Sequence, residues 1–244
     1  MSGAPLPLLG TFHELSLAVH DVPAAVEFFE RLGFTQASTN DTHAHPYGVL
    51  TDGRLFIGVH GRRSTTPTLT FVRPNIERSV PQFAAAGVEL TVCRTGEEVF
   101  NEVAFADPSG QAIAVLEART YSPVDRSARE TSLCGEFTQV SLPTADFEAA
   151  RAFWEPLGFV AAAEEEAPFV HLPLTSDYLD VSFHRPRVSE VPLAVFQAPD
   201  MERRLATLRA GGVACQPLPK AVRASGALLE APGELALLLL AGEP

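Results

Sequence analysis

The sequence predicts an α+β protein made of two tandem copies of one domain, each copy reading β-α-β-β-β twice. Residues 14–34 reappear as residues 139–159, at an offset of 125. Within each copy, short stretches of alternating apolar residues are separated by segments whose apolar residues have helical spacing. A fixed offset over many landmarks indicates a duplication. Later landmarks keep the spacing to within one residue: Phe71 with Phe196, Gly87 with Gly212, and Pro108 with Pro232.

The first module opens with a strand and a capped helix. Residues 12–19 alternate, with Leu15 and Leu17 on one face, which predicts a half-buried strand. Asp21 can cap the helix that follows, Pro23 suits its first turn, and Gly33 can end it. We expect the buried face of this helix to carry Ala24, Val26, Phe28, Phe29 and Leu32.

The remaining elements follow in the same way. Strands are expected near 34–39, 47–51 and 54–60, then a strand at 67–73, a helix from an Asn75 cap to Ala86, and strands near 89–94, 101–106 and 111–117. Pro81 predicts a kink or a late start of that second helix. The second copy repeats the pattern with Asp146 and Asp200 as caps. The predicted first domain is 10–120, the polar linker 121–135 and the second domain 136–244.

Composition restricts the partners. The 244 residues include 18 Lys and Arg and 30 Asp and Glu, a net charge of −12, which disfavours nucleic acid. No apolar run approaches the ~20 residues of a membrane span, and no signal peptide is visible. Three cysteines without a C-x-x-C pair suit a reducing compartment. We expect a cytoplasmic protein without membrane contact and leave open whether it forms a homodimer.

Two runs resemble a known superfamily. The run 14–34 contains Asp21, then Phe28-Phe29-Glu30 and Leu32-Gly33-Phe34, and resembles the start of a vicinal oxygen chelate module. The run 105–117, with its Asp-Pro-Ser-Gly turn before an apolar strand, resembles the end of such a domain. The superfamily includes glyoxalase I, extradiol dioxygenases, and fosfomycin- and bleomycin-resistance proteins. The resemblance covers nearly the whole chain and implies that each domain curls its mixed sheet into an open cup with helices outside. The fold hosts many chemistries.

The resemblance also implies four cup-facing positions that hold a metal in the enzymes of this superfamily. A catalytic divalent metal needs three or more converging donors. Only one residue of the first-domain set is a usual ligand, so we predict no usual metal site and no cofactor, although a shift in the alignment would leave a divalent metal open. The matching residues are Glu14, Gly58, Thr68 and Ala114 in the first domain, and Gln139, Ser182, Leu193 and approximately Leu237 in the second.

Two histidines end equivalent strands, 55–60 and 179–184. Strand alternation turns His60 into the first cup and His184 into the second. Glu14 and His60 would then place a carboxylate and an imidazole in one cup, the minimum for acid–base catalysis. A hydrogen-bonded histidine at a sheet rim is the alternative, because duplication alone explains both copies. A further pair, His43 and His45, lies in a turn-rich stretch and is predicted to be an exposed loop.

These observations favour a metal-free protein that binds a small organic molecule in its cups. The alternative is an enzyme, a glyoxalase-like lyase or isomerase or a dioxygenase, using a metal or Glu14 and His60 as catalytic acid and base. A third hypothesis makes the second domain a structural support only. Besides Glu14 and His60, the predicted binding residues are Ser16, Phe56, Thr68 and Thr70 in the first cup, and Gln139, Ser141, Asp180, Ser182 and His184 in the second.

Overall fold

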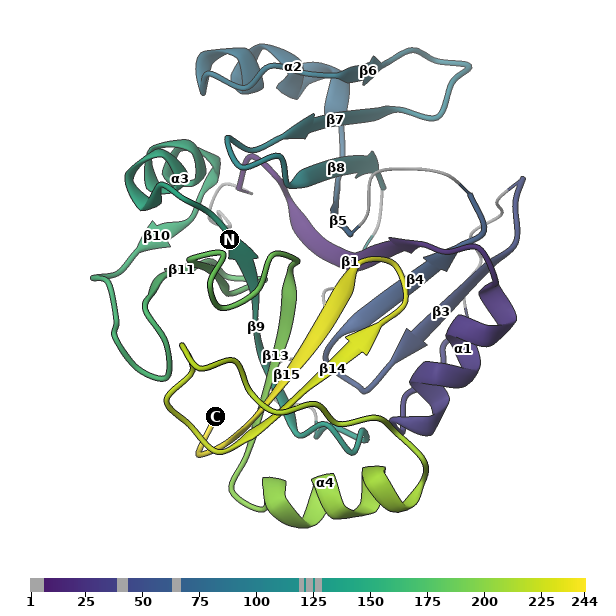
Figure 1. Cartoon of the computed structure of the whole chain (residues 1–244). Helices are drawn as coiled ribbons and strands as arrows, with labels where there is room; N and C mark the ends of the chain where they lie inside the picture. The colour runs from purple at the N-terminus through teal and green to yellow at the C-terminus, as the bar shows by residue number, and fades with distance from the viewer. Residues whose placement is uncertain (1–6, 39–43, 63–66, 119–120, 122–124, 126–128) are drawn as a thin grey trace.

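The computed structural model describes residues 7–38, 44–62, 67–118, 121, 125 and 129–244. Two mixed sheets lie at the centre of the molecule and the helices lie around them (Figure 1). The first sheet contains β1 (Thr11–Ala18), β2 (Thr35–Gln36), β3 (Tyr47–Thr51), β4 (Phe56–His60), β5 (Thr68–Arg73), β6 (Val92–Arg94), β7 (Glu102–Ala106) and β8 (Ala112–Glu117), with helices α1 (Val22–Arg31) and α2 (Ile76–Ala85).

The second sheet repeats this plan. Its elements are β9 (Glu136–Pro143), α3 (Phe147–Trp154) followed by a short 3₁₀ turn (Glu155–Leu157), β10 (Val160–Ala161), β11 (His171–Thr175), β12 (Val181–His184), β13 (Leu193–Ala198), α4 (Met201–Ala210), β14 (Gly226–Ala231) and β15 (Leu235–Ala241).

The two sheets have the same strand order, as the repeat predicts. Among the described residues the orders are β2-β3-β4-β1-β5-β8-β7-β6 and β10-β11-β12-β9-β13-β15-β14. The registers correspond as well, since β4 lies parallel to β1 with His60 opposite Ala18, and β12 lies parallel to β9 with His184 opposite Pro143. One strand differs: the counterpart of β6 is reduced to a bridge between Gln216 and Leu228. The tandem two-sheet α+β architecture is confirmed, whereas the limits of the two domains stay a prediction.

Two of the four predicted helix caps are confirmed by a capping bond. Asp21 accepts a hydrogen bond from the Ala24 amide at 3.0 Å, and Asp146 accepts one from the Ala149 amide at 3.0 Å. These bonds satisfy amides that no helical carbonyl can reach. Each cap therefore fixes where a strand of the cup turns into its helix.

Asn75 and Asp200 hold the predicted N-cap positions of α2 and α4, but neither side chain makes a capping bond. Asn75 has a left-handed backbone, with φ 57°. Asp200 instead binds the guanidinium groups of Arg203 and Arg204. Helix α2 continues through Pro81 from Ile76 to Ala85 and does not begin late.

The buried face of α1 differs from the expected one. Ala24 is exposed, whereas Val22, Ala25 and Phe29 are buried. The spacing of three and four residues from Val22 to Leu32 keeps this stripe on the side that packs against the first sheet.

One hydrophobic core joins the two halves. The rings of Phe34 and Phe196 lie 6.3 Å apart, and those of Phe105 and Phe153 lie 6.1 Å apart. Trp154 is fully buried, and its indole Nε1 donates to Asp107 Oδ2 at 3.2 Å. The face of each sheet that turns away from this core is its cup face.

No helix among the described residues is long and apolar enough to span a bilayer.

Candidate functional site

The first cup is formed by one face of the first sheet. Glu14 and Ser16 of β1 lie opposite Thr70 and Thr68 of β5, and Ser16 also pairs with Gly58 of β4. Alternate residues of these strands, such as Leu15, Leu17 and Leu69, enter the main core, so the polar set lies on the opposite face. Thr70 is therefore the residue of β5 that lies directly opposite Glu14.

Glu14 is the centre of this cup and is 3% exposed. Its Oε1 accepts a hydrogen bond from Ser16 Oγ at 2.7 Å and lies 3.0 Å from His60 Nε2. Its Oε2 accepts a bond from the Tyr47 hydroxyl at 2.9 Å. Burial alone would raise the pKa of Glu14, but the bonds from His60 and Ser16 and the charge of His13 lower it more, so that the pKa lies below its ordinary value. The carboxylate is therefore ionised at neutral pH.

His60 extends this contact into a chain of three groups. Its Nδ1 lies 3.1 Å from Nε2 of His45, so a carboxylate, an imidazole and a second imidazole are linked in series. The Tyr47 ring lies against His60 with centroids 4.5 Å apart. The prediction of an exposed loop was wrong for His45, which is half-buried because the segment before β3 brings its ring onto His60. Its partner in the predicted pair, His43, lies outside the described residues.

The positions that the superfamily uses for a metal do not supply a donor set. A Cβ on Gly58 would lie 2.2 Å from Glu14 Oε1, so the carboxylate fills the space that a side chain would need there. Thr70 shares its hydroxyl contact, 2.7 Å, with Ser16, and Ala114 has no donor. Among the described residues, no three side chains of His, Cys, Asp or Glu converge on one point. The described side chains therefore do not fit a three-donor metal centre.

Sequence reasoning brought Glu14, His60, Ser16 and Thr70 into one cluster, and the structure places them in contact. Phe56 and Thr68 lie half-buried on the same face, at the start of β4 and β5. The remaining members of the cluster, His45 and Tyr47, were not predicted. One signal in the sequence could have identified Tyr47. It is the first residue of the predicted strand 47–51, and this strand pairs with β4 so that Tyr47 lies opposite His60.

The second cup holds a different hydrogen-bonded chain. Ser182 Oγ donates to Ser141 Oγ at 2.8 Å, and Ser141 Oγ lies 2.8 Å from His184 Nδ1. The opposite nitrogen of His184, Nε2, lies 3.1 Å from the Ser189 carbonyl and donates to it. All three side chains are fully buried, and burial lowers the pKa of His184 from 6.5 to about 4. His184 is therefore neutral at pH 7.

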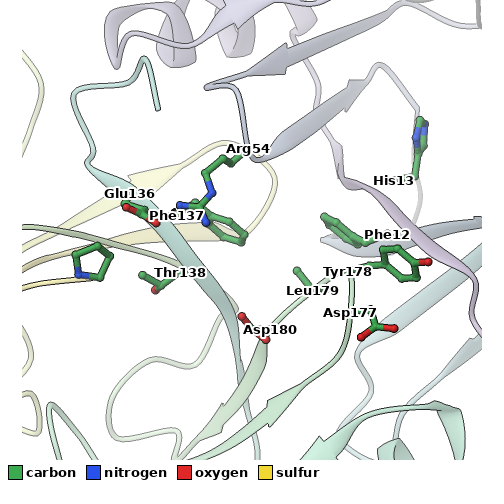
Figure 2. A pocket seen from close by; sticks show the side chains of 11 residues that line it. Phe12, His13, Arg54, Glu136, Phe137, Thr138, Asp177, Tyr178, Leu179 and Asp180 are labelled. Atoms are coloured by element: carbon green, nitrogen blue, oxygen red, sulfur yellow. Dashed lines mark hydrogen bonds and ion pairs between the residues drawn. The ribbon is translucent and has the colours of Figure 1, made fainter. Parts of the chain in front are cut away.

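Two other predicted residues of the second cup lie apart from this chain. Gln139 is half-buried on β9. Asp180 accepts a hydrogen bond from the Thr175 hydroxyl at 2.5 Å and borders a hollow between the two halves (Figure 2).

The two cup faces differ most at their floors. In the second cup, the large apolar side chains of β13 and β15 that face the cup are fully buried. They form a hydrophobic cluster, separate from the main core, with residues of the loops that cover this face, among them Val188 and Val222. In the first cup, Thr68, Ala112, Ala114 and Leu116 are half-buried. Equivalent pairs are Thr68 and Leu193, Thr70 and Val195, Ala112 and Ala236, Ala114 and Leu238, and Leu116 and Leu240. The register places Leu238, not Leu237, on the cup side.

Solved structures with this architecture include dioxygenases and a glyoxalase. No family model and no curated protein matches the chain. A catechol 2,3-dioxygenase structure has 15% identity over 96% of this chain and 92% of its own, with a TM-score of 0.57. The 2,3-dioxygenase LapB from Pseudomonas sp. KL28 has 13% identity over 99% and 95%, with a TM-score of 0.62. The Mn(II)-bound glyoxalase from Novosphingobium aromaticivorans has 12% identity over 93% and 80%, with a TM-score of 0.60. The chain thus shares the tandem two-sheet fold of these dioxygenase and glyoxalase structures.

Proposed function

We propose that this protein binds a small organic molecule in its first cup, without the metal of the superfamily's enzymes, and that the second cup is a structural support. The observation that carries the proposal is a difference in side-chain size between the two cup floors, which are the cup-facing residues of β5 and β8 in the first half and of β13 and β15 in the second. Threonine and alanine stand in the first cup where buried leucine and valine fill the second. Folding alone favours the filled version, because buried apolar area stabilises the native state. These smaller side chains lie on the one cup face that also carries a buried carboxylate.

The polar end of this cup favours a ligand with a hydroxyl group. Glu14 accepts hydrogen bonds from Ser16, Tyr47 and His60, which stabilise its carboxylate. His45 is half-buried, its Nε2 lies 3.1 Å from His60 Nδ1, and an imidazole can both donate and accept hydrogen bonds. A flat aromatic molecule with a hydroxyl group suits a cup whose walls are threonine and alanine side chains and whose polar end includes an imidazole. Structures with this fold include a catechol 2,3-dioxygenase, which supports phenols as the first class to test.

The donor chemistry supports the absence of the usual metal role. Gly58, Thr70 and Ala114 offer no imidazole or carboxylate beside Glu14, and both Glu14 oxygens already accept hydrogen bonds. Divalent metals in catalytic sites require several such donors. Elemental analysis of protein purified without chelators tests this part. One equivalent of Zn, Ni, Mn or Fe per chain would contradict it.

Calorimetric titration with catechol and a panel of substituted phenols tests the binding proposal. We expect Glu14→Gln to weaken the best phenol about tenfold to a hundredfold, because an ionised hydrogen-bond partner is removed from the chain that holds the ligand. Glu164→Gln, at an exposed carboxylate far from the cup in sequence, is the matched control and should bind like the parent. Equal binding by the parent and Glu14→Gln would contradict a role for Glu14.

A second candidate function is acid–base catalysis in the same cup. The chain from Glu14 through His60 to His45 is the arrangement that orients an imidazole and stabilises its protonated form. In this reading His45 takes a proton from the substrate, and Glu14 stabilises the charge through His60. The test is turnover of methylglyoxal with glutathione in metal-free buffer. Turnover that is lost in His45→Ala and retained in Glu164→Gln would favour this function. No turnover of that substrate would leave binding as the only supported role of the cup.

A further inference from the structure

A second site lies between the two halves, outside both cups. A cavity of about 220 Å³ is bordered by the starts of β1 and β9 and by the turns β3–β4 and β11–β12. Phe12 and Phe137 are equivalent residues of the duplication, and Arg54 and Tyr178 lie at equivalent turn positions (Figure 2). Each half therefore contributes the same two structural elements, as at a pseudo-twofold axis. Ligand sites occur preferentially at such boundaries between domains.

Both turns that border the cavity are held by the same type of clamp. Asp52 Oδ1 accepts hydrogen bonds from the amides of Arg54 and Leu55 at 2.9 and 2.8 Å. At the equivalent position of the other half, Ser176 Oγ accepts bonds from the amides of Tyr178 and Leu179. Side chains that close a turn in this way restrict its backbone. The walls of the cavity are thus formed in advance, which lowers the entropy cost of binding.

The charge of the lining favours a cation. Three carboxylates border the cavity, from Glu136, Asp177 and Asp180, against the guanidinium of Arg54 and the imidazole of His13. That guanidinium is bound by Glu136 and also by Glu130 at 2.7 Å, so its own charge is offset. The whole protein carries a net charge of −12, which attracts cations further.

The apolar part of the lining favours an aromatic ligand. Phe12, Phe137 and Tyr178 border the cavity and pack against the main core on their other side. Aromatic rings attract cations through their faces and stack against other rings. We propose that this cavity binds a small primary ammonium compound with an aromatic ring, its ammonium group facing Asp177 and Asp180 and its ring lying among Phe12, Phe137 and Tyr178. This site does not depend on the function proposed for the first cup.

Titration of the full chain with three matched probes tests the proposal. The probes are 2-phenylethylammonium, the neutral 2-phenylethanol and the anionic 3-phenylpropionate, followed by calorimetry and by amide NMR. We expect the ammonium compound to bind at least tenfold more tightly than the alcohol and the anion, and its affinity to fall several-fold when salt is raised. The shifted amides should include Phe137, Thr138 and Tyr178. Asp180→Asn and Tyr178→Ala should each weaken it about tenfold, whereas Glu164→Gln should bind like the parent.

Asn can still accept the hydrogen bond from Thr175, so Asp180→Asn should keep the turn folded. If it unfolds, Asp177→Asn replaces it in the same assay. Equal affinity for the ammonium compound and the alcohol, no binding at up to about 10 mM, or unchanged affinity in the carboxylate and Tyr178 variants would overturn the proposal. Shifts confined to the first cup, at Ala112 and Ala114, would also overturn it.

Discussion

A large apolar side chain on the floor of the first cup should make this cup as closely packed as the second. The equivalent of Ala114 is Leu238, which is fully buried, and the neighbours of Ala114 across the sheet are Thr70 and Ala104. Because both neighbours are small, a leucine at position 114 has room to lie on the cup floor. Ala114→Leu should therefore fold and should block phenol binding.

The size of the effect on folding follows from the added carbon atoms. Leucine adds three carbons to alanine, and each buried methylene contributes about 0.8 kcal/mol, which sets an upper limit of about 2 kcal/mol. Ala114 is half-buried, so we expect a gain of about 1 kcal/mol in the free energy of unfolding. The converse variant, Leu238→Ala, removes a fully buried side chain and should cost about 2–5 kcal/mol while leaving ligand affinity unchanged.

Urea unfolding and calorimetric titration with the best phenol test both variants. A loss of more than about 2 kcal/mol in Ala114→Leu would mean that the first cup is already packed. Parent-like phenol affinity in that variant would place the ligand elsewhere. Either result would refute the reasoning from the two cup floors.

Three further predictions concern buried polar groups. The pKa of His184 is about 4 in the folded protein against 6.5 in the unfolded chain, so the free energy of unfolding should fall by up to about 3 kcal/mol as the pH drops from 6.5 to 4. Urea unfolding at several pH values should show a smaller fall in His184→Gln. A parent protein whose free energy of unfolding does not change over this pH range would contradict the prediction. In His60→Gln, carboxyl NMR should show the pKa of Glu14 higher than in the parent, because burial remains while the strongest lowering contact is lost; an unchanged value contradicts it. Trp154→Phe should cost about 2–4 kcal/mol, because Asp107 loses a buried donor; a cost below about 0.5 kcal/mol contradicts it.

The duplication made most of the fold predictable. Strand alternation and a constant offset predicted both sheets, and capping chemistry predicted the starts of α1 and α3 at Asp21 and Asp146. The capping bonds at Asn75 and Asp200 are absent because the residue type permits a capping bond but does not require one. Asp200 meets two arginines on its own helix, and a charge-assisted bond with them competes with the amides.

The site was predictable only in part, because alternation gives the face of a residue but not its neighbours. Glu14 and His60 could be placed in one cup from their strands alone. His45 could not, because its position depends on how the segment before β3 folds onto that cup. The filling of the second cup was also missed, since it depends on loops that contribute Val188 and Val222. The cavity between the halves needs the packing of two turns that are far apart in the sequence.

The central claim is that one cup of two binds the ligand, and alanine methyl groups report on both cups directly. Ala112 and Ala236 are equivalent residues of the two floors, and Ala114 adds a second reporter in the first cup. NMR of the full chain with labelled alanine methyls, titrated with catechol and the phenol panel, is therefore the most direct measurement. We predict saturable shifts at Ala112 and Ala114, with Ala236 unchanged. Shifts at Ala236, or no shift at any of the three methyls while binding is measured by calorimetry, would contradict the claim.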